Sequence, residues 1–354
     1  MGYRRRTLAS IRELAPLKRP TKFGRLAKHS IGILLSIGCL VVFFRQFELE
    51  KLLHALAGFD YTYLIFGILF LGMGYAFRVL RWSVMLKSAG SEVGFTACSA
   101  PFLGSITLNN VLPFRIGDVV RALVFPASMG ITKTTATSSL IVERLMDLIT
   151  LLACLAIGLF AIEGIQISTE LKFSAVTLAI AGFLMLLFIF FFSDVLGGLF
   201  HKKADTSESG VVVKICSAAR DLLRSLNSMS RPNILSSMIA ISALVWVGEA
   251  GLFYFILQGM HFESAPIEAL LVMSVATLST LLPSSPGYVG TFHVAAFIAV
   301  SLIGGTAEEA GSFAIIVHLA LWLPTTLAGA LAIWMHPRLF CAAKTNWKNF
   351  KQCT

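Results

Sequence analysis

Charged residues are scarce in this sequence. Lys, Arg, Asp and Glu together make up 14% of its 354 residues, whereas about a quarter is typical of a soluble domain. Hydrophobic residues reach 56%, and the mean hydropathy is +0.80. This balance argues against an ordinary soluble domain and predicts an all-α, polytopic membrane protein.

The signatures of several common chemistries are also missing. The chain contains no Walker loop, no HExxH and no GxSxG, so the sequence predicts no catalytic residues, no metal site and no cofactor. Its six cysteines are scattered, which indicates neither disulfides nor a CxxC site. We therefore expect a protein that is not an enzyme.

What the sequence does contain is apolar runs close to the length that spans a bilayer. We predict six full transmembrane helices, at Ser30–Phe44, Tyr61–Phe77, Ser138–Ile162, Phe173–Phe192, Ile234–Leu257 and Ser312–Met335.

Two composite segments, Thr96–Met129 and Ile267–Ile303, lie between these runs and carry the same short motif. Residues 111–119 read VLPFRIGDV, and residues 281–289 read LLPSSPGYV. Pro removes a backbone donor and Gly lowers helix propensity, so each copy is expected to interrupt a helix at membrane depth. We interpret each segment as a re-entrant helical hairpin, and the alternative is that each of its halves crosses the membrane fully. For the repeated motif itself, the alternative is chance recurrence in an apolar, Gly-rich chain.

The distribution of Lys and Arg predicts the orientation. The tails 1–28 and 338–354 and an amphipathic linker, 193–231, are basic and are expected on the cytoplasmic side of a prokaryotic-type inner membrane, near its anionic lipids. The net charge of +10 is thereby explained without a nucleic-acid partner. Within the membrane domain, 29–337, repeat one (about 61–192) and repeat two (about 232–337) are then inverted, an arrangement typical of transporters.

The two hairpins differ in polarity. Two Arg and one Asp in the first leave a surplus positive charge, which suits an anionic headgroup, as does a half-helix N-terminus after Pro113 or Pro286. Alternatively, these charges pair with each other or lie at the interface. The polar residues are Asn109, Asn110, Arg115, Asp118 and Arg121 in the first hairpin, and Ser284, Ser285, Thr291 and His293 in the second.

Further polar residues lie within the predicted spans. Glu143, Arg144 and Asp147 form a cluster that either neutralises the arginines of the first hairpin, binds a coupling proton or a cationic group, or fixes helix packing. Glu249 is expected to be alone, hence a candidate for proton coupling or a neutral, hydrogen-bonded acid. His293 and His318 are weaker signals, without metal-ligand spacing.

A basic aromatic motif follows the second predicted span. Arg78 and Arg81 in FRVLRW are expected to form an interfacial belt, with Trp82 at headgroup level.

Four motifs together resemble the flippase-like membrane proteins related to the transmembrane region of lysylphosphatidylglycerol synthase. They are FRVLRW, NNVLPFRIGDVVRA, ERLMD and LPSSPGYVGTFHVA, and the resemblance extends from about Lys28 to Pro337. It implies a lipid-headgroup flippase or a partner of enzymes that use lipid-linked sugars. It also implies binding positions at Asn109, Arg115, Asp118, Arg121, Glu143, Arg144 and Asp147, with Pro283, Pro286, Gly287 and Gly290 shaping the second hairpin.

The sequence departs from that family at three positions. Phe114 replaces an expected small residue, Asp118 an expected Glu, and His293 an expected acid, which bears on any mechanism that needs a carboxylate in the second hairpin. Only 17 residues follow Pro337, so no aminoacyl-transferase domain is expected.

Taken with the motifs, the sequence predicts a transporter of an anionic or zwitterionic phospholipid, or of a polyprenyl-phosphate-linked lipid. The alternative is a non-transporting partner that presents a lipid to a glycosyl- or aminoacyltransferase. A membrane enzyme acting on lipid phosphate is disfavoured, because no pair of nucleophile and base is recognisable.

Overall fold

The computed structural model describes residues 36–45, 49–162, 169–192, 198, 210–262, 265–282, 284–337 and 339–340, and the regular structure among them is helical, with no strand. Residues 36–44 form a short helix. The longer elements are α2 (Leu49–Ala57), α3 (Tyr61–Ser88), α4 (Phe95–Val111), α5 (Ile116–Leu123), α6 (Pro126–Met129), α7 (Lys133–Ala161), α8 (Thr169–Phe191), α10 (Gly210–Met229), α11 (Pro232–Gly259), α12 (Pro266–Leu278), α13 (Thr291–Leu302) and α14 (Ala307–Met335). The all-α prediction is confirmed for this part of the chain.

Three of the described helices, α3, α11 and α14, are long and apolar enough to cross a membrane. Helices α7 and α8, of 29 and 23 residues, cover two further predicted spans. Of the first predicted span, residues 30–35 lie outside the described residues. The tails 1–28 and 341–354 and most of the linker segment 193–209 also lie outside them.

Helix α3 extends eleven residues beyond the predicted end of its span, through the FRVLRW motif. Arg81 and Trp82 are fully buried, and the Trp82 indole donates a hydrogen bond to the Ser139 hydroxyl on α7 at 3.1 Å. The prediction of an interfacial belt is therefore wrong. Both side chains face neighbouring helices rather than lipid headgroups, because polar partners on those helices meet them in the interior.

Both copies of the LPxxxGxV motif interrupt a helix, as predicted, but with different backbones. In the first, the 3-10 turn η1 (Pro113–Arg115) places Phe114 and Arg115 at φ of 60° and 50°. In the second, the turn η3 (Pro286–Tyr288) places Gly287 and Tyr288 at φ of 71° and 59°. Residues other than Gly in this left-handed region store strain of the order of 1–3 kcal/mol, which is often found at functional sites.

The turn Pro113–Arg115 is the first break and the turn around Pro286–Tyr288 is the second. Gly117 was expected to help interrupt the helix, but it lies inside α5. A Cβ at Gly117 would collide with the backbone oxygen of Ser105 on α4. Here glycine is required for the close approach of two half-helices, so α5 folds back along α4. The half-helices after the breaks begin at Ile116 and Thr291, a few residues beyond Pro113 and Pro286.

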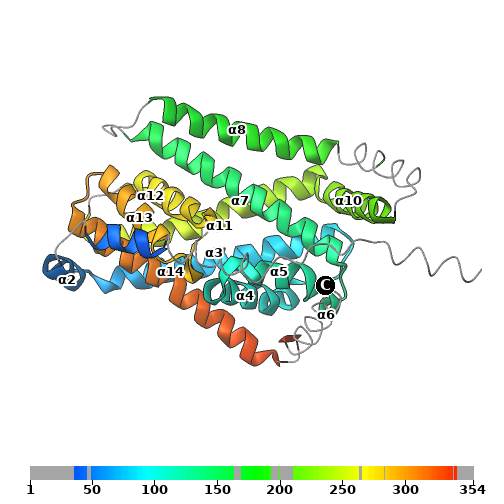
Figure 1. Cartoon of the computed structure of the whole chain (residues 1–354), viewed down its shortest axis with the longest axis horizontal. Coiled ribbons are helices and arrows are strands. Elements are labelled where there is room, and N and C mark those ends of the chain that lie inside the picture. The colour runs from blue at the N-terminus through cyan, green and yellow to red at the C-terminus, as the bar shows by residue number, and fades with distance from the viewer. Residues whose placement is uncertain are drawn as a thin grey trace, which may run out of the picture.

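Several helix contacts come in matching pairs, in which a contact made by a helix of the first half has a counterpart made by the equivalent helix of the second half. The most extensive contact joins α3 to α11. Helix α4 packs on α14 and α12 packs on α7, while α2 packs on α14 and α10 on α7. Figure 1 shows α4 and α5 toward one end of the long axis and α12 and α13 toward the other, with α2 and α10 likewise at opposite ends.

The amphipathic α10 lies within the predicted amphipathic linker, 193–231, and it packs against α7. Helix α2 packs against α14 in the same way, so α10 takes part in the repeated helix packing as well as connecting the halves.

Candidate functional site

The two helix breaks meet in the interior of the molecule. Arg115 of the first break donates to the carbonyl and hydroxyl oxygens of Thr280, just before the second break, at 3.3 Å each. The Arg115 guanidinium also lies 5.6 Å from the centre of the Tyr288 ring. Segments 165 residues apart in the sequence therefore form one site.

Asn109 and Asn110 hold the first break in position. The Asn109 amide donates to Asp118 Oδ1 at 2.9 Å and accepts from the Asp118 backbone N–H at 3.1 Å, which ties the half-helices together across the break. Asn110 donates to Thr325 and Thr326 on α14, at 3.1 and 2.9 Å. The Asp118 backbone N–H, at the start of α5, thus finds a partner in the interior, as a membrane protein requires.

A network of buried ion pairs surrounds this junction. Asp147 on α7 accepts from Arg81 at 2.7 Å and lies 3.7 Å from Arg78, both on α3. Arg144 contacts both carboxylate oxygens of Asp118 at 3.0 Å. Removing one member of a buried pair such as Arg81–Asp147 typically costs about 3–5 kcal/mol. Together these contacts fix the arrangement of α3, α5 and α7.

Glu249 belongs to the same network, and the prediction that it is alone is wrong. Its carboxylate lies 2.6 Å from the Arg78 guanidinium and accepts from the Thr277 hydroxyl at 3.1 Å. The sequence could not reveal this partner, because Arg78 is 171 residues away. The arginine comes from α3, which packs along the whole of α11.

Arg121 is buried in structural contacts. It pairs with Glu143 at 2.8 Å, and its guanidinium lies over the rings of Trp82 and Phe102 at 5.2 and 4.7 Å. Glu143 therefore neutralises Arg121, which was one of the open interpretations of the α7 cluster. Arg121 and Glu143 are both buried and line neither cavity described below.

Arg115 differs from the other arginines of the site because no carboxylate pairs with it among the described residues. Five arginines of the site face four carboxylates, and among the described residues Arg115 makes no ion pair. Its neutral partners, a carbonyl and a hydroxyl, are at the long end of the hydrogen-bonding range. The site therefore has a net positive charge at the first break.

Two adjoining cavities open at the junction. The larger, about 310 Å³, is lined by both halves of the chain and includes Arg115, Arg144, Asp147, Asn109 and Asn110. The smaller, about 130 Å³, is lined largely by α14 and the second break. Six residues line both, namely Tyr75, Asn110, Glu249, Thr277, Thr280 and Tyr288.

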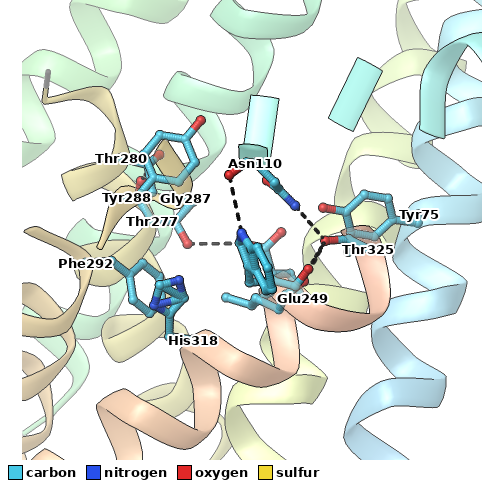
Figure 2. Close-up of a pocket in the computed structure, with 12 residues that line it drawn as sticks. Tyr75, Asn110, Glu249, Thr277, Thr280, Gly287, Tyr288, Phe292, His318 and Thr325 are labelled. Atoms are coloured by element: carbon cyan, nitrogen blue, oxygen red, sulfur yellow. Dashed lines mark hydrogen bonds between the residues drawn. The ribbon is translucent and has the colours of Figure 1, made fainter. Parts of the chain in front are cut away.

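Figure 2 shows the smaller cavity, where Tyr75 and Asn110 from the first half face His318 and Phe292 from the second. The lining combines aromatic rings with hydroxyl and amide groups around Glu249. Such a hollow suits a small polar group that enters from the larger, positively charged cavity.

Of the residues predicted to shape the second break, Gly287, from the turn after Pro286, lines the smaller cavity, and Pro283 is outside the described residues. The backbone N–H of Ser285 donates a hydrogen bond to the Ser36 hydroxyl at 2.8 Å. A Cβ at Gly290 would lie 2.5 Å from the backbone oxygen of Ser36, so glycine permits the helix 36–44 to approach.

Several residues of the site were not among those predicted. Arg78 and Arg81 complete the ion pairs, and Tyr75 and Trp322 line the cavities. The arginines had a signal in the sequence, since they are three apart on one helix face directly after an apolar run. The aromatic residues had none, because aromatic side chains are common throughout this chain.

These features define a class: a polytopic helical membrane protein with a polar, positively charged hollow between two similarly packed halves. Residues 30–329 match the family described as the lysylphosphatidylglycerol synthase TM region, and the chain belongs to that family. The resemblance noted from the four motifs is thereby confirmed.

Two curated proteins are similar to this chain over most of its length. A protein of Haloferax volcanii called glycosyltransferase AglD is 23% identical over 337 residues, which cover 85% of this chain and 53% of that protein. A UPF0104 membrane protein of Methanothermobacter thermautotrophicus is 21% identical over 331 residues, covering 86% of this chain and 95% of the relative. The chain thus corresponds to about half the length of the first of these relatives.

Proposed function

We propose that this protein moves a lipid with a phosphate-containing, anionic or zwitterionic headgroup between the two leaflets of the membrane, and that Arg115 binds the phosphate. The lipid is a phospholipid or a polyprenyl-phosphate-linked lipid. The observation that carries the proposal is the Arg115 guanidinium at the first helix break, which makes no ion pair among the described residues and lines a cavity between the two halves. Guanidinium groups suit phosphate because two N–H donors match two of its oxygens.

The other candidate residues have different roles in this proposal. Arg144, with a side chain 34% exposed, lines the larger cavity and supplies a second cation, partly neutralised by Asp118. Asn109 and Asn110 hold the break. Arg121 and Glu143 hold α5 against α7, and so keep Arg115 in position.

The membrane architecture is part of the same proposal. Six spans and two re-entrant hairpins, inverted between repeats, account for the matching pairs of helix contacts and for the hairpins at opposite ends. The charge bias supports an inner-membrane protein with both termini in the cytoplasm. Alternating access then corresponds to opening the shared hollow to each leaflet in turn.

Leaflet exchange in proteoliposomes tests the transport proposal. Lipids labelled on an acyl chain, with phosphatidylglycerol or phosphatidylethanolamine headgroups, are scored by quenching from outside. We expect Arg115→Gln to slow exchange at least about tenfold, the loss expected when a charge-assisted contact of roughly 1.5–3 kcal/mol is removed. Arg115→Lys should restore part of the rate, because a point charge lacks the bidentate fork.

The matched control is Arg220→Gln on α10, which removes a half-buried arginine outside the site, whose ion-pair partner is the adjacent Asp221. It should exchange lipid at the wild-type rate. Equal rates for Arg115→Gln and Arg220→Gln, with both proteins folded, would refute the role of Arg115.

A second candidate function is a membrane partner that presents a lipid to a transferase without moving it. It is favoured by the relative named as a glycosyltransferase, which this chain matches over about half of that protein's length. This function predicts lipid binding that depends on Arg115 but no exchange in proteoliposomes. A labelled lipid that is chemically altered during the assay would instead indicate an enzyme.

A further inference from the structure

Two histidines of the second half are in contact beside the smaller cavity. The Nε2 atom of His293 on α13 lies 3.3 Å from the Nδ1 atom of His318 on α14, and the ring centres are 4.5 Å apart. His293 also accepts, at Nδ1, a hydrogen bond from the backbone N–H of Gly290 at 3.4 Å. This pair therefore links the second break to α14.

These contacts determine which ring nitrogens carry hydrogen when both rings are neutral. The Gly290 N–H can only donate, so His293 Nδ1 has no hydrogen and His293 Nε2 has one. His293 Nε2 then donates to His318 Nδ1, which leaves the hydrogen of His318 on its own Nε2. His318 lines the smaller cavity. The neutral pair thus has both of its ring acceptors in use.

An added proton consequently breaks one of the two contacts. If it binds at His318 Nδ1, two N–H groups face each other and the bond between the rings is lost. If it is passed on to His293 Nδ1, that atom faces the Gly290 N–H and the bond at the start of α13 is lost. Either result releases a restraint on the second break.

The second break is well placed to respond. Gly287, Tyr288 and Gly290 all have positive φ, of 71°, 59° and 95°. Tyr288 lines both cavities and contacts Arg115. A change at Gly290 can therefore reach the cation at the first break through a single short turn.

We propose that the His293–His318 pair is a proton-binding site that couples proton uptake to the geometry of the second break and, through Tyr288, to the headgroup site. Its role in transport rests on the function proposed above, whereas proton binding itself can be tested on the protein alone.

The other titratable groups near the pair are few among the described residues. Glu249 and Tyr75 line the smaller cavity from α11 and α3, and Tyr288 lines it from the break. Glu249 is held by Arg78 at 2.6 Å. From the helix 36–44, Cys39 approaches Gly290, and the Phe43 ring packs 5.3 Å from His293. The pair is thus the part of this hollow in which neutral rings can accept a proton.

Histidine-selective ¹⁵N NMR of the full chain in detergent tests proton binding directly. At high pH both rings should show the form with hydrogen on Nε2. On acidification, one ring of the pair should gain a proton. Signals are assigned from the variants His293→Asn and His318→Asn, and His54→Gln on the exposed part of α2 is the control. Hydrogen on Nδ1 at high pH, or two rings that stay neutral throughout, would overturn the proposal.

Leaflet exchange as a function of pH tests the coupling. In His318→Asn the amide oxygen replaces Nδ1 as acceptor but cannot titrate, so the variant should lose the pH dependence that wild type and His54→Gln show. An identical pH profile in wild type and His318→Asn, with exchange present, would refute coupling and leave transport standing. Titration of the pair in a protein that exchanges no lipid at any pH would refute the transport proposal and leave the proton site standing.

Discussion

The contact between α3 and α11 permits a stability prediction that is independent of any function. Gly248 on α11 and Gly74 on α3 lie against each other. A Cβ added at Gly248 would be 2.6 Å from Gly74 Cα and 2.7 Å from both Gly74 N and the backbone oxygen of Phe70. Carbon atoms pack best at roughly 3.5–4.0 Å, so Gly248→Ala requires the helices to separate by about 1 Å.

The expected cost follows from two opposing effects. Overpacking of this kind costs about 1–3 kcal/mol. Replacing Gly by Ala inside a helix returns up to about 1 kcal/mol of helix propensity. With the full gain in propensity, the net expectation for Gly248→Ala is a loss of up to about 2 kcal/mol, which at roughly 2–4 °C for each kcal/mol lowers Tm by up to several degrees.

The matched control is Gly72→Ala on α3, where a Cβ would meet nothing within 4 Å. This variant receives only the gain in propensity and should unfold at or slightly above the wild-type temperature. A thiol-reactive dye can follow unfolding in detergent, because Cys98 and Cys154 are buried in the folded protein. If Gly248→Ala is as stable as Gly72→Ala, the close packing of α3 on α11 is wrong.

Two further predictions concern the ion pairs and the topology. Arg121→Gln leaves the buried Glu143 without its closest cation and should cost about 3–5 kcal/mol in a chemical or thermal unfolding experiment, and a Tm equal to wild type would contradict the pairing. In a background without reactive native cysteines, Ala57→Cys and Glu92→Cys, beyond opposite ends of α3, should be labelled from the outside and from the cytoplasm respectively. Labelling of both from one side would refute α3 as a span.

Much of the fold follows from the sequence because the bilayer imposes a simple rule. Backbone groups in hydrocarbon must be satisfied within a segment, so long apolar runs become helices, and α11 extends only two residues beyond each end of its predicted span. Pro113 and Pro286 likewise lie at the helix interruptions because proline removes a donor whatever surrounds it. One interpretation left open for the α7 cluster, that it neutralises an arginine of the first break, is found between Glu143 and Arg121, in keeping with the cost of an isolated charge at depth.

The partners themselves were decided by the tertiary structure. Glu249 was expected to be alone because its neighbours in sequence are apolar, yet α3 brings Arg78 to 2.6 Å. The same packing buries Arg81, pairs His293 with His318 and leaves Arg115 without a carboxylate among the described residues. Local sequence determines where a helix begins, breaks and ends, whereas ion pairs and hydrogen bonds depend on distances of 2.6–3.3 Å between side chains that only the packing of distant helices sets.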